Sequence, residues 1–302
     1  MTQYRREVEA IAREAGTLLM SYFARHITFE YKGEVDLVTE ADRASEKLIV
    51  ERLRARWPEY GIVGEEGTRT DPGAEYRWYV DPLDGTTNFA HGFPVFCVSI
   101  ALVHKATPTS ALRRRSGPAP SALVGDPGEK EGELLAGVLY DPTRDEMFSA
   151  ERGLGATLNG KPIQVSQTKR LSESLLGTGF PSHKRHLNPN IHFYHQITLR
   201  SHGVRRAGSA ALDLANVACG RYDGFWEFNL NPWDTAAGAL LVQEAGGTVT
   251  RFDGSPYRLD SREVLASNGL IHEKLMKNFK EIFAGRGLEA LPSLAEYAKS
   301  RK

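Results

Sequence analysis

The sequence has few cysteines, no excess of charge of either sign and no long apolar run. Cys97 and Cys219 are its two cysteines among 302 residues, and no CxxC motif is present. A disulfide framework is therefore not expected, and both are interpreted as small buried hydrophobic residues. Lysine and arginine number 38, as do aspartate and glutamate, which argues against a nucleic-acid-binding or membrane protein. Because no run of roughly 18 apolar residues and no N-terminal apolar signal segment is present, a cytoplasmic protein is expected.

The first part of the chain contains two helical patterns followed by strand-like segments. Apolar residues recur at helical spacing from Val8 to Phe23, and a second helix is expected between Thr39 and Pro58. Short apolar or β-branched segments then predict strands at 61–64, 77–80, 96–103 and 136–140. Helices followed by strands indicate layers of helix on a mixed or antiparallel sheet, an α+β fold.

Residues 105–133 interrupt this pattern. They contain several prolines, glycines and serines, the run Arg113-Arg114-Arg115 and little apolar periodicity. The segment is predicted to be an exposed, mobile loop between two strands. The arginine run is interpreted as a solvated surface feature, with an anion-binding or nucleic-acid-binding role as the less favoured alternative.

The second part of the chain repeats the alternation of strands and helices. Strands are expected at 173–180, 225–228, 248–251 and 264–266, and helices at 190–202, 209–218, 233–245 and 272–283. Gly246-Gly247 ends the third of these helices. A charged tail runs from 286 to 302.

The segment Asp81-Pro82-Leu83-Asp84-Gly85-Thr86-Thr87-Asn88 directly follows an apolar strand-like run. Two acids three residues apart at a strand end can point to one place, and the turn leaves the Leu83 carbonyl facing the same point. Carboxylates and a backbone carbonyl are the oxygen ligands that Mg²⁺ prefers. If a helix begins after Gly85, its first N–H groups suit a phosphate. This segment predicts metal ligands beside an anion-binding turn.

Two further acids lie at the ends of predicted elements. Glu65 follows the strand 61–64, and Asp234 stands at the start of the helix after Pro232-Trp233. Taken singly, Glu65 is a solvated strand end and Asp234 a helix-capping residue. Combined with Asp81 and Asp84, they are candidates for the same metal site.

Several motifs resemble the inositol monophosphatase family. Asp81 to Thr86 resembles its first signature, and Trp233-Asp234-Thr235-Ala236-Ala237-Gly238, followed by Glu244-Ala245-Gly246-Gly247, resembles its second. Gly64-Glu65-Glu66, the segment Lys32 to Thr39 with Asp42, Gly208 to Ala211 and Phe225-Trp226-Glu227 resemble further family segments in the family's order. The resemblance covers about residues 5 to 285 and implies a five-layered αβαβα sugar-phosphatase fold, usually a homodimer. It implies one catalytic domain over 1–285, with an N-terminal part to about 167 and a C-terminal part from 168.

The resemblance also implies the site. Glu65, Asp81 and the Leu83 carbonyl would hold one Mg²⁺, and Asp81, Asp84 and Asp234 a second, with a third ion near Glu65. Thr86 with Asp42 would orient the attacking water, so that Thr86, Asp42 and Glu65 are the catalytic candidates. Gly85, Thr86, Ala210, Glu227 and Asp234 would bind the substrate, and inhibition by Li⁺ is expected.

The substrate and the class of function stay open at this point. Myo-inositol monophosphate is favoured, because Glu227 suits a polyol and repels a second phosphate. Histidinol phosphate is an alternative, since Glu227 could pair with an ammonium group. Fructose 1,6-bisphosphate is another, with Lys184, Arg185, Arg205 and Arg206 as candidate cations. Some bacterial relatives instead act as binding partners in transcription complexes, for which Arg113-Arg114-Arg115 is the candidate contact here.

Overall fold

The computed structural model describes most of the chain. The described residues are 3–23, 29–31, 37–105, 123–124, 132–180, 188–291, 293–294 and 298–299.

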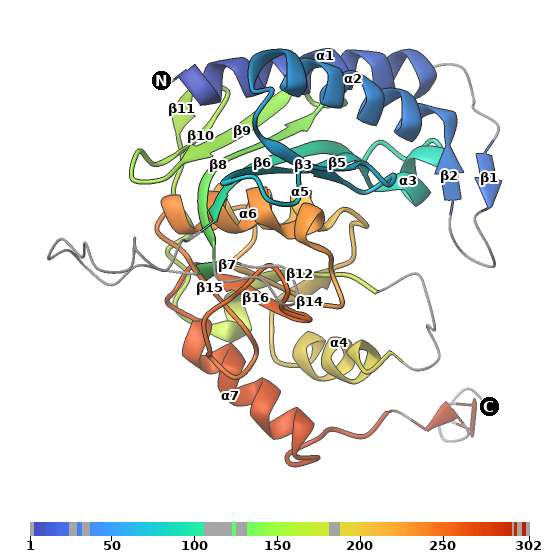
Figure 1. The fold of residues 1–302 in the computed structure, drawn as a ribbon. Helices are drawn as coiled ribbons and strands as arrows, with labels where there is room; N and C mark the ends of the chain where they lie inside the picture. Colours follow the sequence, from blue (N-terminus) through green and yellow to red (C-terminus); the bar gives the residue numbers. More distant parts are fainter. Residues whose placement is uncertain are drawn as a thin grey trace, which may run out of the picture.

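Helices and sheets alternate in five layers, as Figure 1 shows. From top to bottom in that view these are α1 with α2, a first sheet, α5 with α6, a second sheet, and α4 with α7. The helices are α1 (Gln3–Phe23), α2 (Glu40–Arg56), α3 (Thr86–Ala90), α4 (Asn190–Thr198), α5 (Ala210–Ala218), α6 (Pro232–Glu244) and α7 (His272–Phe283). The layered αβαβα fold expected from the sequence is confirmed.

The first sheet has nine strands, with the order β11-β10-β9-β8-β6-β5-β3-β4 and β7 beside β8. Its strands are β3 (Gly61–Gly64), β4 (Arg69–Thr70), β5 (Tyr76–Asp84), β6 (Cys97–Lys105), β7 (Leu123–Val124), β8 (Gly132–Asp141), β9 (Glu146–Glu151), β10 (Ala156–Leu158) and β11 (Lys161–Pro162). Within it, β3 and β5 are parallel. The pairs β5 with β6, β6 with β8 and β8 with β9 are antiparallel. The parallel pair brings the ends of β3 and β5 to the same edge.

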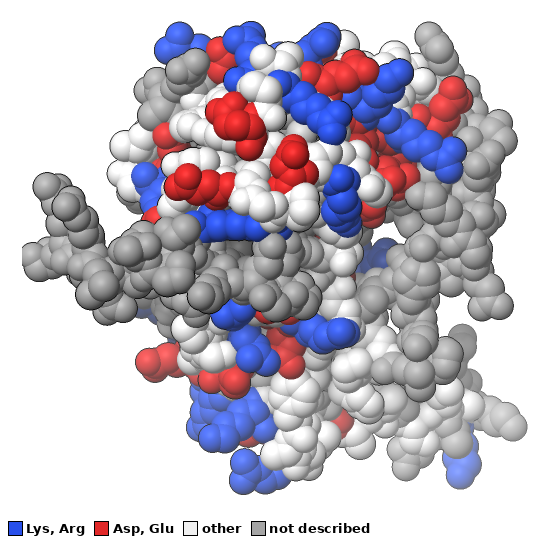
Figure 2. Space-filling view, viewed as in Figure 1, with Lys and Arg blue, Asp and Glu red and all other residues white. Residues whose placement is uncertain are grey.

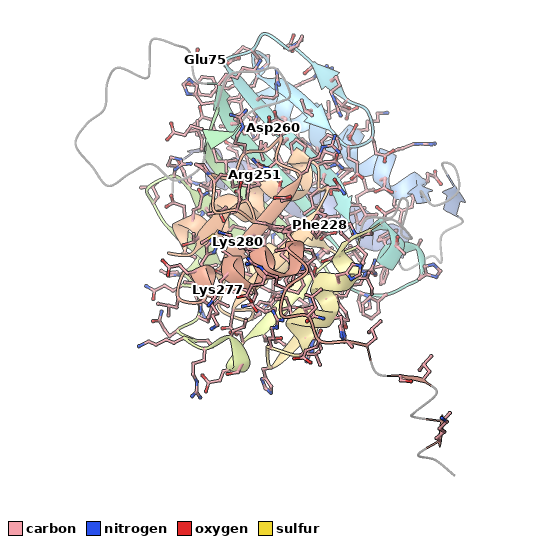
Figure 3. The ribbon with its side chains drawn as sticks, turned by 90° about the horizontal axis from the view of Figure 1, so that it is seen from below. Glu75, Phe228, Arg251, Asp260, Lys277 and Lys280 are labelled. Atoms are coloured by element: carbon pink, nitrogen blue, oxygen red, sulfur yellow. The ribbon has the colours of Figure 1, made fainter. Side chains whose placement is uncertain are left out.

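The second sheet has five strands, in the order β13-β12-β14-β16-β15. They are β12 (Leu175–Thr178), β13 (Gly203–Arg205), β14 (Gly224–Phe228), β15 (Thr248–Thr250) and β16 (Glu263–Ser267). A separate pair, β1 (Phe29–Tyr31) and β2 (Leu37–Thr39), precedes α2. Figure 3 views the molecule from below, with α7 and its exposed Lys277 and Lys280 in front of the second sheet.

Three clusters of buried apolar side chains hold the layers together. Ile49 of α2 belongs to the cluster between α1, α2 and the first sheet, and Leu214 of α5 to the cluster between the two sheets. Phe279 of α7 belongs to the third, beneath the second sheet. Each such side chain stabilises the fold by about 1.5–3 kcal/mol on burial. Gly137 on β8 lets α6 approach closely, because an added Cβ would lie 2.9 Å from the Ala237 backbone.

Several expectations need adjustment. The helix expected over 190–202 ends at Thr198, because the chain must turn to pair Gly203–Arg205 with β12. The strand expected over 173–180 is shorter, since residues 171–173 form a 3₁₀ turn. Residues 146–162 form three strands that the sequence analysis left unassigned. Cys97 is buried as expected, but Cys219 is partly exposed, and both are free thiols.

The expected loop over 105–133 contains one short strand, β7, which pairs with the start of β8. The run Arg113-Arg114-Arg115 and the rest of that loop lie outside the described residues, as do Lys32 to Asp36, Lys184 and Arg185. After α7 the chain returns to α4, where the Glu289 N–H donates to Gln196 Oε1 at 2.9 Å. The interpretation of 1–285 as one catalytic domain stays a prediction.

The described surface carries both signs of charge side by side. Figure 2 shows lysines and arginines interspersed with acidic residues over the α1 and α2 layer. Within the described part of the chain, no helix is long and apolar enough to cross a membrane.

Candidate functional site

The parallel pairing of β3 and β5 places two acids together. Gly64 is paired with Val80, and the Glu65 N–H donates to the Val80 carbonyl at 3.1 Å. Glu65 and Asp81 therefore follow paired residues at the same edge of the sheet. The Asp81 side chain is fixed there, because its Oδ1 accepts a hydrogen bond from the Leu83 N–H at 2.9 Å. Asp81 is 1% exposed, whereas Glu65 keeps a solvent-accessible surface.

Helix α6 brings Asp234 to the same place. Pro232 stands at the first helical turn, and a capping box joins Asn231 and Asp234, with the Asn231 N–H donating to Asp234 Oδ2 at 2.7 Å. Ser99 of β6 anchors this turn to the first sheet by donating to the Trp233 carbonyl at 3.0 Å. Carboxylate oxygens of Glu65, Asp81 and Asp234 consequently lie within 4.8 Å of one another.

Burial and mutual repulsion raise the pKa values of these acids. The pKa of Glu65 is raised to about 8, first by burial among protein atoms and then by Asp234. The pKa of Asp234 is raised to about 7 by burial and by Asp84, and that of Asp81 is raised well above its ordinary value by burial and Glu65. Carboxylates held this close tolerate full ionisation only when a positive charge balances them.

Asp84 lies at the start of α5 rather than within the group of three. Its Oδ2 accepts hydrogen bonds from the Ser209 hydroxyl at 2.6 Å and the Ala211 N–H at 2.7 Å. Burial raises the pKa of Asp84, and these hydrogen bonds oppose the rise. A carboxylate at a helix N-terminus is stabilised by the exposed N–H groups. Asp84 thus links the first sheet to α5, and its charge still acts on Asp81 and Asp234.

The turn after β5 has the geometry that the sequence indicated. Gly85 has a φ of 103°, and an added Cβ would lie 2.7 Å from the Val95 carbonyl oxygen, so that only glycine fits. Helix α3 begins at the next residue, Thr86. The Thr86 hydroxyl donates to the Leu83 carbonyl at 3.1 Å, which leaves its oxygen lone pairs to accept from a water.

Helix α2 supports this edge of the sheet with three polar side chains. Asp42 is 2% exposed and lies near enough to raise the pKa of Glu65. Ser45 donates to the Pro82 carbonyl at 3.0 Å. The buried Glu46 accepts from the Glu66 N–H at 2.8 Å and from the Thr68 hydroxyl at 2.6 Å. Ser45 and Glu46 were not predicted as site residues, although both fall in phase with the buried Ile49, a polar signal on an apolar helix face.

Replacing Glu46 by glutamine should loosen the turn that positions Glu65. An amide has one acceptor oxygen and turns its NH₂ group toward backbone N–H donors, so stability should fall by about 1–3 kcal/mol. Because partners that orient metal ligands matter for affinity, Mg²⁺ binding should weaken by about 10–100-fold. Thermal denaturation and calorimetric Mg²⁺ titration measure both. Glu51→Gln on the exposed side of α2 is the matched control, and unchanged Mg²⁺ affinity of Glu46→Gln would contradict the positioning.

Glu227 lies on β14, beside the end of β12. It is 7% exposed, and its pKa is raised well above the ordinary value by burial and by Asp234 and Asp84. A Cβ added to Gly179 would lie 2.1 Å from a Glu227 carboxylate oxygen, so the carboxylate occupies the space that glycine leaves. Ala210, the other substrate-side candidate, is the first residue of α5. Both residues lie near the acidic group. Asp234 and Asp84 are close enough to raise the pKa of Glu227, and Asp84 accepts a hydrogen bond from the N–H of Ala211, which follows Ala210.

The donor set fits a hard divalent cation. Three carboxylates within 4.8 Å, with the Leu83 carbonyl at the turn between Asp81 and Asp84, match the oxygen ligands of Mg²⁺. The raised pKa values arise from burial and from neighbouring carboxylates, and a cation would supply the balancing charge. The assignment of each residue as ligand stays a prediction.

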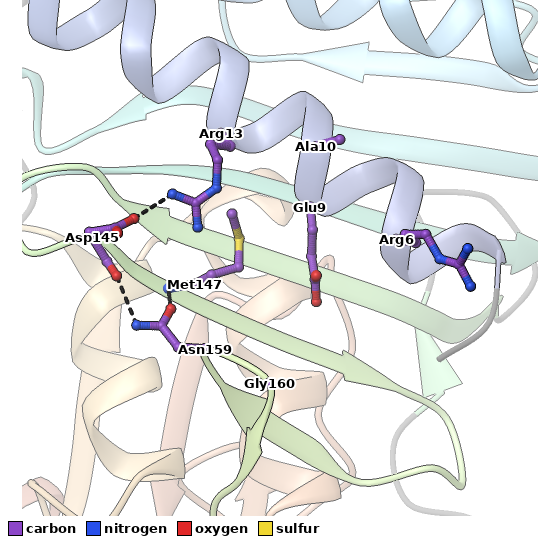
Figure 4. A pocket seen from close by; sticks show the side chains of 8 residues that line it. All are labelled: Arg6, Glu9, Ala10, Arg13, Asp145, Met147, Asn159 and Gly160. Carbon is purple, nitrogen blue, oxygen red and sulfur yellow. Dashed lines mark hydrogen bonds and ion pairs between the residues drawn. The ribbon is translucent and has the colours of Figure 1, made fainter.

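A second surface feature, a pocket of about 660 Å³ between α1 and the β9–β11 strands, is less suited to chemistry. Figure 4 shows its lining, in which Arg13 pairs with Asp145 at 2.5 Å. Glu9 bonds Arg5 and Ser149. Its acids and Arg13 are therefore already engaged with neighbouring groups, and the acidic group at the end of β5 is the better candidate.

The fold and this acidic group match those expected of a metal-dependent phosphatase, and comparisons with known proteins identify the family. The sequence profile of the inositol monophosphatase family matches residues 1–112 and 129–284. The chain belongs to this family, whose members are metal-dependent phosphoric monoester hydrolases.

Individual relatives are similar over most of the chain. An inositol-1-monophosphatase of Synechocystis is 44% identical over 264 residues, covering 86% of this chain and 83% of the relative. Nus factor SuhB of Pseudomonas aeruginosa is 44% identical over 265 residues, covering 85% and 88%. The structure of SuhB from Bartonella henselae superposes with a TM-score of 0.79 at 37% identity, covering 93% of this chain and 99% of that one.

Proposed function

We propose that this protein hydrolyses a small phosphomonoester with Mg²⁺, and that its substrate is myo-inositol monophosphate. The observation that carries the proposal is the group of Glu65, Asp81 and Asp234 with raised pKa values, close enough for Asp234 to act on the carboxylate of Glu227. The name inositol-1-monophosphatase borne by the Synechocystis relative supports the same substrate.

Each candidate residue has a role in this proposal. Two Mg²⁺ ions would be held by the carboxylates of Glu65, Asp81, Asp84 and Asp234 and by the Leu83 carbonyl. A third ion would lie near Glu65. Bound Mg²⁺ would lower the pKa of water and neutralise charge on the leaving oxygen. Gly85 and Thr86 N–H groups bind phosphate. Glu227 and the Ala210 backbone bind the leaving group.

The reaction forms a bond between a water oxygen and phosphorus and breaks the ester bond to the leaving group. The Thr86 hydroxyl already donates to Leu83, so Thr86 accepts a hydrogen bond from the attacking water and fixes its direction. Asp42, buried near Glu65, is the proposed partner that receives or holds the water proton. The leaving alkoxide takes up a proton from water and departs as the free alcohol.

The test is a panel of phosphomonoesters with Mg²⁺. We expect the largest kcat/KM for inositol 1-phosphate, compared with histidinol phosphate and fructose 1,6-bisphosphate on the same sample. A larger kcat/KM for histidinol phosphate or fructose 1,6-bisphosphate would contradict the proposed substrate but not the proposed phosphomonoester hydrolysis. No turnover of any phosphomonoester by folded protein would overturn the proposal.

Replacing Gly179 by alanine tests the role of Glu227 directly. The backbone of Gly179 does not require glycine, but the new Cβ would displace the Glu227 carboxylate. The KM for inositol 1-phosphate should rise by about tenfold or more, because a misplaced polar partner leaves substrate hydroxyls unpaired. Turnover of p-nitrophenyl phosphate should stay within about threefold, since its leaving group has no hydroxyls to bind there. Gly73→Ala, where nothing lies within 4 Å, is the control. Equal loss on both substrates would count against substrate selection by Glu227.

Binding in a transcription complex is a second candidate. The Pseudomonas aeruginosa relative carries the name Nus factor SuhB, and this role would be favoured by an inactive but folded protein in the panel above. A homodimer is also proposed, on the family resemblance, and light scattering in solution tests it. The cytoplasmic location stays a prediction from the sequence.

A further inference from the structure

Asn88, the last residue of the segment 81–88, has no part in the proposed reaction, yet its side chain joins two turns beside the acidic group. Its amide nitrogen donates to the Val95 carbonyl at 2.8 Å and to the Ala207 carbonyl at 2.9 Å, and the Gly208 carbonyl lies at 3.4 Å. The bond to Ala207 connects residues 119 positions apart in the chain. A primary amide has two N–H donors, so both are used to hold backbone carbonyls.

The backbone of Asn88 is itself anchored in α3. The next residue, Phe89, is 3% exposed, and its ring packs edge-on against Phe96 with the ring centroids 4.9 Å apart. The Asn88 carbonyl accepts a hydrogen bond from the Phe93 N–H at 2.8 Å. Because the side-chain amide extends from an anchored position, its bonds can fix the place of the two carbonyls that it contacts.

The first of these carbonyls lies against the turn that follows Asp84. A Cβ added to Gly85 would lie 2.7 Å from the Val95 oxygen, so this oxygen is in contact with the backbone of the turn. A carbonyl held there without a partner would be costly to the fold. The bond from Asn88 satisfies it and keeps it against Gly85.

The second carbonyl begins the turn that holds the Asp84 carboxylate. Gly208 follows Ala207 with a φ of 89°, and a Cβ there would lie 3.0 Å from the Asn88 amide nitrogen, so glycine lets the side chain and the turn meet. Ser209 comes next, and its hydroxyl donates to Asp84 Oδ2 at 2.6 Å. The residue that Asn88 holds is therefore only two positions before the residue that orients Asp84.

We propose that Asn88 is a positioning residue for metal binding: by holding the carbonyls of Val95 and Ala207, it fixes the turn 207–211 against the turn after β5 and so directs the Asp84 carboxylate toward the acidic group. The inference rests on the proposed function, in which Asp84 is a metal ligand. A ligand that is oriented by hydrogen bonds from a neighbouring turn keeps its direction only while that turn keeps its place.

The first test is calorimetric Mg²⁺ titration of Asn88→Leu and Asn88→Ala, at a temperature where circular dichroism shows both to be folded. Leucine has similar bulk but no donor, so both carbonyls lose their partner and the Mg²⁺ affinity should fall by about tenfold or more. Alanine leaves space for water to donate to the same carbonyls, so its loss should be only about threefold. The Mg²⁺ concentration for half-maximal turnover of p-nitrophenyl phosphate should rise by the same factors.

The second test asks whether Asn88 acts through Ser209. Ser209→Ala removes the hydroxyl bond to Asp84 and should weaken Mg²⁺ binding by itself. If Asn88 acts through the same turn, the Mg²⁺ affinity of the double variant Asn88→Leu with Ser209→Ala should lie within about threefold of that of the weaker-binding single variant. Losses that multiply would show that the two residues act independently, and would overturn the inference.

Asn278→Leu is the matched control. Asn278 is a buried asparagine of α7, beneath the second sheet, and its amide donates to the Lys274 carbonyl at 2.7 Å. Its replacement should lower the Tm and leave the Mg²⁺ affinity unchanged.

Parent-like Mg²⁺ affinity in folded Asn88→Leu would overturn the inference, since a residue that only supports the fold would lower the Tm alone. If leucine prevents folding, Asn88→Ala decides by the same measurement, and a parent-like affinity there is equally contrary. Failure of the proposed function is distinct, because the unaltered protein would then hydrolyse no phosphomonoester with Mg²⁺.

Discussion

Replacing Asp81 by asparagine should lower kcat for phosphomonoester hydrolysis by at least about a thousandfold, since each 1.36 kcal/mol of lost transition-state stabilisation is tenfold and a bound metal supplies several kcal/mol. Asp81 is the most buried of the three clustered acids, and its carboxylate is held by the Leu83 N–H. The amide keeps the shape of the side chain but removes the charge that a cation needs. Steady-state kinetics with Mg²⁺ measures the loss.

The same substitution should stabilise the metal-free protein. Burial and the charges of Glu65 and Asp84 oppose ionisation of Asp81, so a neutral amide removes a repulsion that the fold otherwise bears. Thermal denaturation in EDTA should show a higher Tm than the parent. Opposite changes in activity and stability mark a residue kept for function. Asp145→Asn, at an exposed ion pair with Arg13, should alter neither by much. Activity of Asp81→Asn above one tenth of the parent, on the order of a 1.4 kcal/mol effect, would contradict a ligand role.

The acids were predictable because Glu65 and Asp234 stand near the end or the start of an element, and Asp81 follows the apolar part of β5. Asp81 and Glu65 follow apolar strand segments, and Asp234 follows a Pro-Trp pair at a helix start. The sequence places such groups at element ends, but it does not state which ends meet. That depends on the parallel pairing of β3 with β5 and on the approach of α6 to β8 at Gly137, both of which join residues far apart in the chain.

The residues that hold the acids in place were not predicted. Glu46 bonds the turn after β3 and Ser45 bonds the Pro82 carbonyl, yet both are polar residues in phase with the apolar side of α2. Periodicity assigns such a residue to the buried side but gives it no partner. The role of Gly179 was also hidden, since a glycine near a strand end usually indicates a turn, whereas here it makes room for a carboxylate.

Layers of helix on sheet followed from the alternation of helix and strand patterns, and the five-layer order followed from the family resemblance, but the strands of residues 146–162 followed from neither. They are short, with two to six residues each, and Gly153, Gly155 and Gly160 in positive-φ turns separate them. Segments of that length carry too few alternating positions for a pattern to emerge. The pairing of β9 with β8, of β10 with β9 and of β11 with β10 supplies the order that local sequence lacks.

Without metal, the protein should lose stability as pH rises from about 5 to 8, and Mg²⁺ should reverse that loss. The pKa of Glu65 is raised from 4.5 to about 8, and that of Asp234 from 3.8 to about 7. Between the unfolded and folded pKa values the folded state binds protons that the unfolded chain has released. Stability is therefore greatest below the unfolded values and falls as pH rises through the folded ones.

Mg²⁺ changes the sign because it binds the deprotonated carboxylates and competes with protons. Its affinity for the folded protein should rise with pH, and a cation that binds only the folded state stabilises it by mass action. The Tm difference between excess Mg²⁺ and EDTA should be near zero at pH 5 and reach about 5 °C or more at pH 8. Differential scanning fluorimetry at both pH values measures it, with NaCl of equal ionic strength as the control for screening. An equal Mg²⁺ effect at both pH values would show that the clustered acids do not bind the ion. No effect at pH 8 would argue against a metal site at the end of β5.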